Sequence, residues 1–430
     1  MNRRILAVGS IAAVAALALA GCSGSTEADK PAASSGPVTL TMSAWSVDTT
    51  PEFKALADAF HEKNPDITIN LKEYDATDYN TLITADLAAG SGPDIITQKE
   101  VKYVTTLQEG GQLLDVSDVK LPKGIGGADS YKVDGKAYAT PYRQDSWVLF
   151  YNKDLFKKAG VAEPDGSWTW DDFDKAAAEL TAGAGGAKGA YLHRWQSVVQ
   201  GFANSQTGSN VLKGKYDYMT PFYERVLKLQ KDGDVVDFNT SSANQLTYQG
   251  EFGKQKAAMM PMGTWFVATL IAQQASGDAD AFPWGIAPIP QLSAKTAGLD
   301  NTPVTFGDPT GFGVNAAASP EKAAAAKKFL AFASSEDAAQ VLAGIGITPA
   351  LNSSTVADTY FGVKGAPTDD LSKFAWSTHK VLAENPTSSK TAAIQGILSD
   401  MHTAIMSGST PVDAAIKEAQ DRVSNEVGLD

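Results

Sequence analysis

The sequence predicts an α/β fold, because its first ordered stretch alternates between the period of a strand and the period of a helix. Every second residue from Val38 to Ala44 is apolar, which is typical of a strand with one buried face. Residues 51–60 then place apolar side chains at helical spacing, and residues 67–71 alternate again. Strand, helix and strand in this order form a βαβ unit with a right-handed crossover, and continued alternation indicates an α/β architecture.

Local signals set the expected boundaries of these elements. Thr50 is the predicted cap of the first helix, with Pro51 at its first position, and Asn64-Pro65 ends it. A second helix is expected from about Asp78 to Ala89. A turn rich in glycine then leads into a short buried strand at residues 94–97.

Helical patterns dominate the rest of the chain. Thr169 and Asp172 have the spacing of a capping box, with Asp in place of the usual Glu. Ala182 to Gly189 reads as a flexible loop. Further helices are predicted over residues 221–231, 263–276, 320–334, 337–344, 391–407 and 410–427, the last with Thr410 as its cap.

Length and charge limit the classes of protein that fit. A chain of 430 residues normally forms two or more domains. Acidic residues outnumber basic ones by 49 to 36, giving a formal charge of −13. Because phosphate backbones are bound by clustered Lys and Arg, this excess of acid argues against nucleic acid as a partner.

The N-terminus predicts export and attachment to a membrane. Arg3 and Arg4 precede an apolar run that ends in Leu19-Ala20-Gly21-Cys22, the pattern of a signal peptide over residues 1–21. The segment resembles a bacterial lipobox, which implies acylation of Cys22. Cys22 is the only cysteine, so a lipid explains it better than a disulfide does. Residues 22–37 lack apolar periodicity and read as a flexible tether.

Several segments resemble one family in order and spacing. These are residues 92–96 (GPDII), 138–142 (YATPY), 149–156 (LFYNKDLF), 252–260 (FGKQKAAMM) with 263–265 (GTW), and 311–315 (GFGVN). The chain is similar here to the extracellular solute-binding proteins of carbohydrate ABC transporters, the family that contains maltose-binding protein.

The resemblance implies a two-lobed periplasmic-binding-protein-like fold with a hinge and an interlobe ligand cleft. Lobe one would comprise residues 38–143 and 306–350, and lobe two residues 144–305 and 351–430. Ligand contacts made by both lobes would favour the closed form. The implied function is capture of an extracellular oligosaccharide and its delivery to ABC permease subunits. The protein would act as a monomer on the extracellular face of the bacterial cytoplasmic membrane.

A sugar site needs aromatic platforms beside groups that form several hydrogen bonds. Trp45 ends the first strand, where open α/β sheets place their ligands. At Gln98, maltose-binding protein has an aromatic residue instead, which argues against a maltose-like specificity. The resemblance implies ligand binding by Trp45, Gln98, Lys99, Asp145, His193, Trp195, Trp265 and Asp308, and Trp376 is a further candidate.

Two other classes of function remain open. A surface-anchored glycoside hydrolase would need two carboxylates about 5–10 Å apart, which sequence spacing does not reveal. The chain has no Gly-x-Ser-x-Gly and no His-Glu-x-x-His motif. A phosphorylated or other non-sugar solute would suit a cleft containing Lys99, Arg143 and Arg194. The sequence predicts no catalytic residue, no cofactor and, from four scattered histidines, no metal site.

Overall fold

The computed structural model describes residues 36–48 and 50–429. The predicted signal peptide, the acylated Cys22 and nearly all of the predicted tether lie outside the described residues. Within the described ranges, no helix is both long and apolar enough to cross a membrane.

A five-stranded sheet in the order β2-β1-β3-β12-β6 forms the first lobe. Strand β1 (Val38–Trp45) lies parallel to β2 (Ile67–Tyr74), and α1 (Glu52–Lys63) joins them, as the predicted βαβ unit requires. Strand β3 (Ile95–Gln98) follows in parallel. Strand β12 (Pro309–Val314) enters antiparallel between β3 and β6 (Thr140–Gln144), although the 164 residues 145–308 separate it from β6 in the chain.

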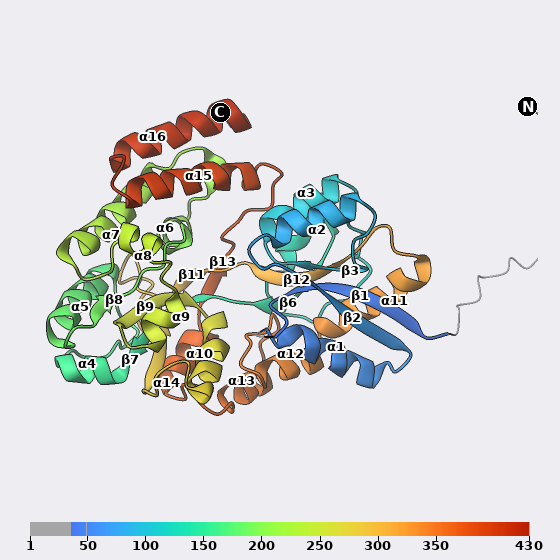
Figure 1. The fold of residues 1–430 in the computed structure, drawn as a ribbon, viewed down its shortest axis with the longest axis horizontal. Coiled ribbons are helices and arrows are strands. Elements are labelled where there is room, and N and C mark those ends of the chain that lie inside the picture. The colour runs from blue at the N-terminus through green and yellow to red at the C-terminus, as the bar shows by residue number, and fades with distance from the viewer. Residues whose placement is uncertain (1–35, 49, 430) are drawn as a thin grey trace, which may run out of the picture. The chain divides into compact units, whose positions relative to one another are not determined.

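Helices cover both faces of this sheet (Figure 1). Phe60 of α1 packs edge to face against Phe329 of α11 (Pro320–Ala333), and both belong to the core beneath β1. The short helix α12 (Glu336–Ala343) contributes to the same face. On the opposite face, α2 (Tyr79–Ala88) and α3 (Val104–Glu109) enclose a separate cluster that contains Ile96.

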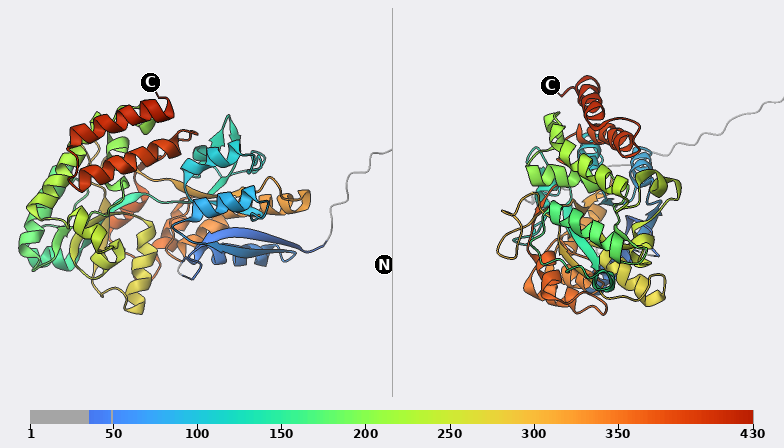
Figure 2. Two further views of the ribbon diagram at one scale, coloured as in Figure 1. Left: turned by 45° about the horizontal axis from the view of Figure 1, so that its top comes forward. Right: turned by 90° about the vertical axis from the view of Figure 1, so that its left-hand side faces the viewer.

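The second lobe is built on the sheet β10-β7-β9-β8. Its central strands β7 (Trp147–Asn152) and β9 (Ala257–Gly263) are antiparallel and buried at every residue. Strands β8 (Lys188–Ala190) and β10 (Trp284–Pro288) form the edges. The helices are α4 (Lys153–Ala159), α5 (Trp170–Gly183), α6 (Ser197–Thr207), α7 (Thr220–Asp232), α8 (Phe238–Ala243), α9 (Tyr248–Gly253), α10 (Trp265–Ser276), α13 (Ser354–Phe361), α14 (Asp370–Ser377), α15 (Thr391–Met406) and α16 (Val412–Arg422). Figure 2 shows α15 and α16 running side by side at the C-terminal end.

Three stretches of chain link the two sheets. The first runs from β6 to β7, and the second from β11 (Val304–Phe306) to β12. The third lies beyond α12, where Pro349 pairs with Arg143. The first two pack so closely that a β-carbon on Gly307 would lie 2.1 Å from the carbonyl oxygen of Asp145. Strand β13 (Lys380–Leu382) pairs with β11 and so brings the C-terminal part of the chain beside the second linking stretch.

The structure confirms the capping box of Thr169 and Asp172 but corrects several predicted boundaries. Pro51 and Pro411 occupy the cap positions expected for Thr50 and Thr410, and among the described residues neither helix has a side-chain cap. The predicted loop at 182–189 is shorter, because α5 extends into its start and β8 takes its end. Gly263 belongs to β9, so α10 begins two residues later than predicted.

Candidate functional site

Four ring-bearing residues gather at one place in the second lobe. His193 and Trp195 lie before α6, Tyr248 begins α9, and Trp265 begins α10. The ring centroids of His193 and Trp195 are 4.4 Å apart, and Trp195 lies 5.7 Å from Tyr248 and 6.3 Å from Trp265. We call these four residues the aromatic group. Trp195 is 41% exposed, Tyr248 and Trp265 are half-buried and His193 is buried, so the group presents mainly the ring of Trp195 to solvent.

The backbone before α10 fixes the ring of Trp265. The indole folds back over Gly263, where a β-carbon would lie only 1.8 Å from it. The indole also meets Trp147 edge to face, with 5.5 Å between the ring centroids. Gly263 is therefore required for this ring orientation, because any side chain there would displace the indole.

His193 is the polar member of the aromatic group. Its Nδ1 lies 2.9 Å from the hydroxyl of Tyr191. Burial, together with the nearby charge of Arg194, lowers the pKa of His193 to about 4. The ring is therefore neutral at pH 7 and can hydrogen-bond without contributing charge.

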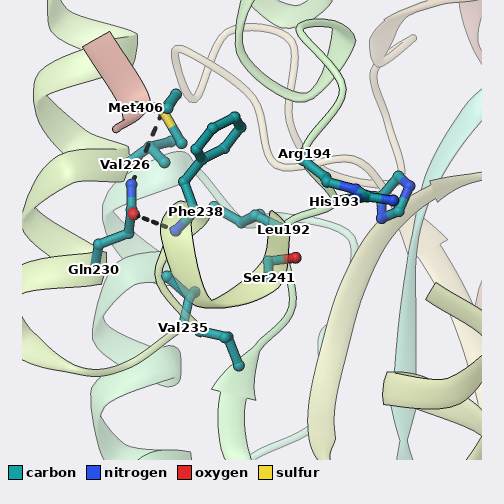
Figure 3. A pocket seen from close by; sticks show the side chains of 10 residues that line it. Leu192, His193, Arg194, Val226, Gln230, Val235, Phe238, Ser241 and Met406 are labelled. Carbon is teal, nitrogen blue, oxygen red and sulfur yellow. Dashed lines mark hydrogen bonds between the residues drawn. The ribbon is translucent and has the colours of Figure 1, made fainter. Parts of the chain in front are cut away.

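The cavity behind His193 and Arg194 is too small to hold a sugar. Figure 3 shows it lined largely by apolar side chains, with Gln230 hydrogen-bonded to the backbone N–H of Phe238. Its volume is about 10 Å³, which is near the minimum for one water molecule. The candidate surface in this region is therefore the exposed side of the aromatic group, and not this cavity.

In the first lobe, two predicted residues lie together. The Lys99 ammonium is 5.2 Å from the centroid of the Trp45 ring and donates to the carbonyl oxygen of Ala76. Burial lowers the pKa of Lys99. Trp45 also contacts Phe53 and Tyr79 edge to face and is partly buried. Gln98 is different, because its side chain is almost fully buried within β3.

Asp145 belongs to a chain of charges that connects the lobes. Its Oδ2 accepts from Arg143 Nε at 2.5 Å, and its Oδ1 accepts from the hydroxyl of Thr264 at 2.8 Å. Arg143 Nη1 also donates to Glu52 of α1 at 2.6 Å. Burial alone would lower the pKa of Arg143, but the two carboxylates raise it above its usual range. We call Glu52, Arg143, Asp145 and Thr264 the charged relay.

Asp308 forms a second polar centre with Glu384. Its carboxylate accepts from the backbone N–H of Glu384 at 2.9 Å and from the Asn385 amide at 2.6 Å. Glu384 in turn accepts from the hydroxyl of Ser197, two residues after Trp195. Burial raises the pKa of Asp308 to about 6. Burial and the charge of Asp308 raise that of Glu384 to about 7.

This pair predicts a fall in stability as the pH rises. Both pKa values lie above their ordinary values of 3.8 and 4.5, so the folded state binds more protons than the unfolded state between about pH 4 and 7. The free energy of unfolding should decrease over that range by several kcal/mol from this pair, since raising one pKa by one pH unit is worth about 1.4 kcal/mol. Urea denaturation at pH 5 and pH 8 measures the decrease. Glu384→Gln, which keeps an acceptor for Ser197, should flatten the profile, and an unchanged slope would assign the effect to other groups.

The structure brings together only some of the predicted ligand-binding residues. His193, Trp195 and Trp265 meet in the second lobe, and Trp45 and Lys99 in the first. Asp145 and Asp308 lie in the linking stretches, and Trp376 is buried in the core. Tyr248 and Glu52 were not among the residues predicted from the sequence. Tyr248 carries no local motif, and Glu52 is 91 residues from Arg143 in the chain.

Comparison with known proteins identifies the family. A family model for bacterial extracellular solute-binding proteins matches residues 46–340. A sugar transporter from Rhizobium etli, solved in an open conformation, is 33% identical and superimposes with a TM-score of 0.78, covering 90% of this chain and 99% of that one. An ABC substrate-binding protein from Listeria monocytogenes in complex with cycloalternan has the same fold at 21% identity, with a TM-score of 0.76, covering 91% of this chain and 99% of that one.

Matches to curated relatives are partial. The sn-glycerol-3-phosphate-binding periplasmic protein UgpB of Brucella abortus is 34% identical over 179 residues, 38% of this chain and 40% of that protein. A second protein of that organism, named as a binding protein, is 27% identical over 60% of this chain, and the match spans 64% of its length. These findings confirm the predicted two-lobed fold and a binding protein rather than an enzyme. The chain belongs to the bacterial extracellular solute-binding protein family.

Proposed function

We propose that this protein is a membrane-tethered receptor that captures an oligosaccharide outside the cell and delivers it to an ABC permease. The observation that carries the proposal is the aromatic group, in which an exposed Trp195 adjoins Tyr248 and Trp265. Sugar rings stack their C–H faces on such platforms. The sugar transporter of Rhizobium etli supports the same class of solute.

The first lobe supplies a matching surface in this proposal. Trp45 offers a second aromatic ring, and Lys99 offers an ammonium beside it. A solute held between Trp45 and the aromatic group would be bound by both lobes, so binding would favour closure. Closure would then be the signal that the permease recognises. The predicted acylation of Cys22 would keep the receptor at the membrane.

A thermal-shift panel tests the class of solute. Residues 23–430 are melted with malto-, manno-, xylo-, fructo- and α-galacto-oligosaccharides, because a ligand that binds only the folded state raises the melting temperature. A clear shift with one series supports the proposal and identifies the sugar. A panel without any shift, repeated by calorimetric titration with the same result, contradicts it.

Substitutions in the aromatic group give a sharper test. Trp265→Ala and Trp195→Ala should each weaken binding of the identified sugar at least tenfold, about 1.4 kcal/mol, because each removes a stacking surface. Trp168→Ala is the matched control, since Trp168 is also partly buried but packs on Phe156 away from the group. Affinities that stay at the wild-type value would remove these two residues from the site.

A phosphorylated solute is the second candidate. The similarity to a glycerol-3-phosphate-binding protein favours it, as does the Arg194 guanidinium, for which the described residues supply no ion-pair partner. The other two candidate cations are engaged, Arg143 by two carboxylates and Lys99 by a carbonyl oxygen and an indole. Adding sn-glycerol-3-phosphate to the panel decides between the classes, because only this candidate predicts a shift with it that Arg194→Gln abolishes.

A further inference from the structure

We infer that Asp145 is a positioning residue that orients Trp265 through Thr264 instead of contacting the solute. This inference rests on the proposed function, in which Trp265 is a platform for the sugar. It assigns Asp145 a role different from the one that the family resemblance implies.

The carboxylate of Asp145 is already occupied on both sides. Arg143 holds Oδ2 and Thr264 holds Oδ1, and the side chain is only 9% exposed. Arg143 is itself fixed, because its planar guanidinium bonds two carboxylates at once, at 2.5 Å and 2.6 Å. A solute hydroxyl that bound Asp145 would have to compete with a buried, charge-assisted contact.

Thr264 transmits the position of Asp145 to the next residue. Its backbone N–H donates to the carbonyl oxygen of Ser146 at 2.9 Å, and its hydroxyl also accepts from the backbone N–H of Ser146 at 3.3 Å. Thr264 is fully buried, so these bonds fix the backbone immediately before Trp265. Because the indole lies directly over Gly263, a small shift of residues 263–264 moves the whole ring.

The other end of the relay lies in the first lobe. Glu52 starts α1 and is 1% exposed, and its second oxygen, Oε2, has no hydrogen-bond partner among the described residues. Burial raises the pKa of Glu52, while Arg143 opposes that effect. The relay therefore has a buried and incompletely satisfied end in one lobe and a solute platform at its other end. Movement of α1 relative to the second lobe would therefore change the position of the Trp265 ring.

Hydrogen exchange in the absence of solute tests the relay directly. In full-length protein, Asp145→Asn should accelerate amide exchange in the first turn of α10, residues 265–269, by about tenfold, and Thr264→Val should do the same. The double variant should exchange no faster than either single one, because both substitutions weaken the same link: Asn has a single acceptor oxygen, whereas Asp145 gives one oxygen to Arg143 and the other to Thr264. Unchanged exchange in Asp145→Asn, or additive effects, would overturn the inference.

Two controls keep the result specific. Thr264→Ser retains the hydroxyl and should exchange at the wild-type rate. If Asp145→Asn does not fold, the comparison of Thr264→Val with Thr264→Ser still decides whether the hydroxyl link holds α10. Asp237→Asn alters the cap of α8 elsewhere in the second lobe and should leave residues 265–269 unchanged.

Affinity measurements separate this inference from the proposed function. With the sugar identified in the panel, Asp145→Asn and Thr264→Val should weaken binding by similar factors, and the double variant no further. Direct contact of Asp145 with the sugar would instead make the two losses multiply, which would refute the positioning role. If no sugar binds the wild-type protein, the proposed function fails, and the exchange experiment still tests the relay.

Discussion

Arg143→Met is expected to reduce the free energy of unfolding by about 3–5 kcal/mol. The guanidinium is the sole cation between the carboxylates of Glu52 and Asp145 within the charged relay, and its side chain is only 12% exposed. Its removal would leave two buried carboxylates without a counter-charge. Urea denaturation at pH 7, read by circular dichroism, measures the loss.

A surface arginine provides the matched control. Arg422 also pairs with two carboxylates, those of Asp400 and Glu426, but its side chain is 34% exposed and theirs are more than half exposed. Arg422→Met should therefore cost less than about 1 kcal/mol, because water solvates the freed carboxylates. Equal losses for the two substitutions would show that burial does not set the strength of the relay. Combining Arg143→Met with Glu52→Gln and Asp145→Asn should restore part of the loss, since no buried charge then remains.

Trp376→Ala is expected to cost about 3–5 kcal/mol of stability without acting directly on the solute site. The side chain is 1% exposed, stacks on Tyr360 at 4.7 Å and donates from Nε1 to the hydroxyl of Thr348 at 3.3 Å. Removing it would leave a large cavity among residues that cannot fully close it.

Trp195 provides an exposed counterpart to the buried Trp376. Trp195 is 41% exposed, so Trp195→Ala should change the free energy of unfolding by less than about 1 kcal/mol while lowering the affinity for the sugar. Denaturation curves and sugar affinities are measured for both variants. Wild-type stability of Trp376→Ala would contradict the predicted loss. Loss of sugar affinity without loss of stability would show that Trp376 acts at the solute site.

Local patterns predicted most of the elements but not all of their ends. Hydrophobic periodicity was sufficient to predict β1, α1 and β2, because the period depends on the face that each element presents to the core. Thr50 and Thr410 were wrongly predicted as caps, since a proline after a threonine allows more than one start for a helix. The short edge strands β8 and β13 carry too few residues to show a period.

The sequence by itself determined the α/β class, the family resemblance and the aromatic residues from which a sugar site could be built. It also predicted the signal peptide and the lipidated Cys22, which stay predictions. Only the tertiary structure decided which of these residues meet. Trp195 and Trp376 are the same residue type, yet one is exposed in the aromatic group and the other is buried against Tyr360. Glu52 and Arg143 pair across 91 residues of chain. Such contacts follow from how the sheets and helices pack, and no local pattern records them.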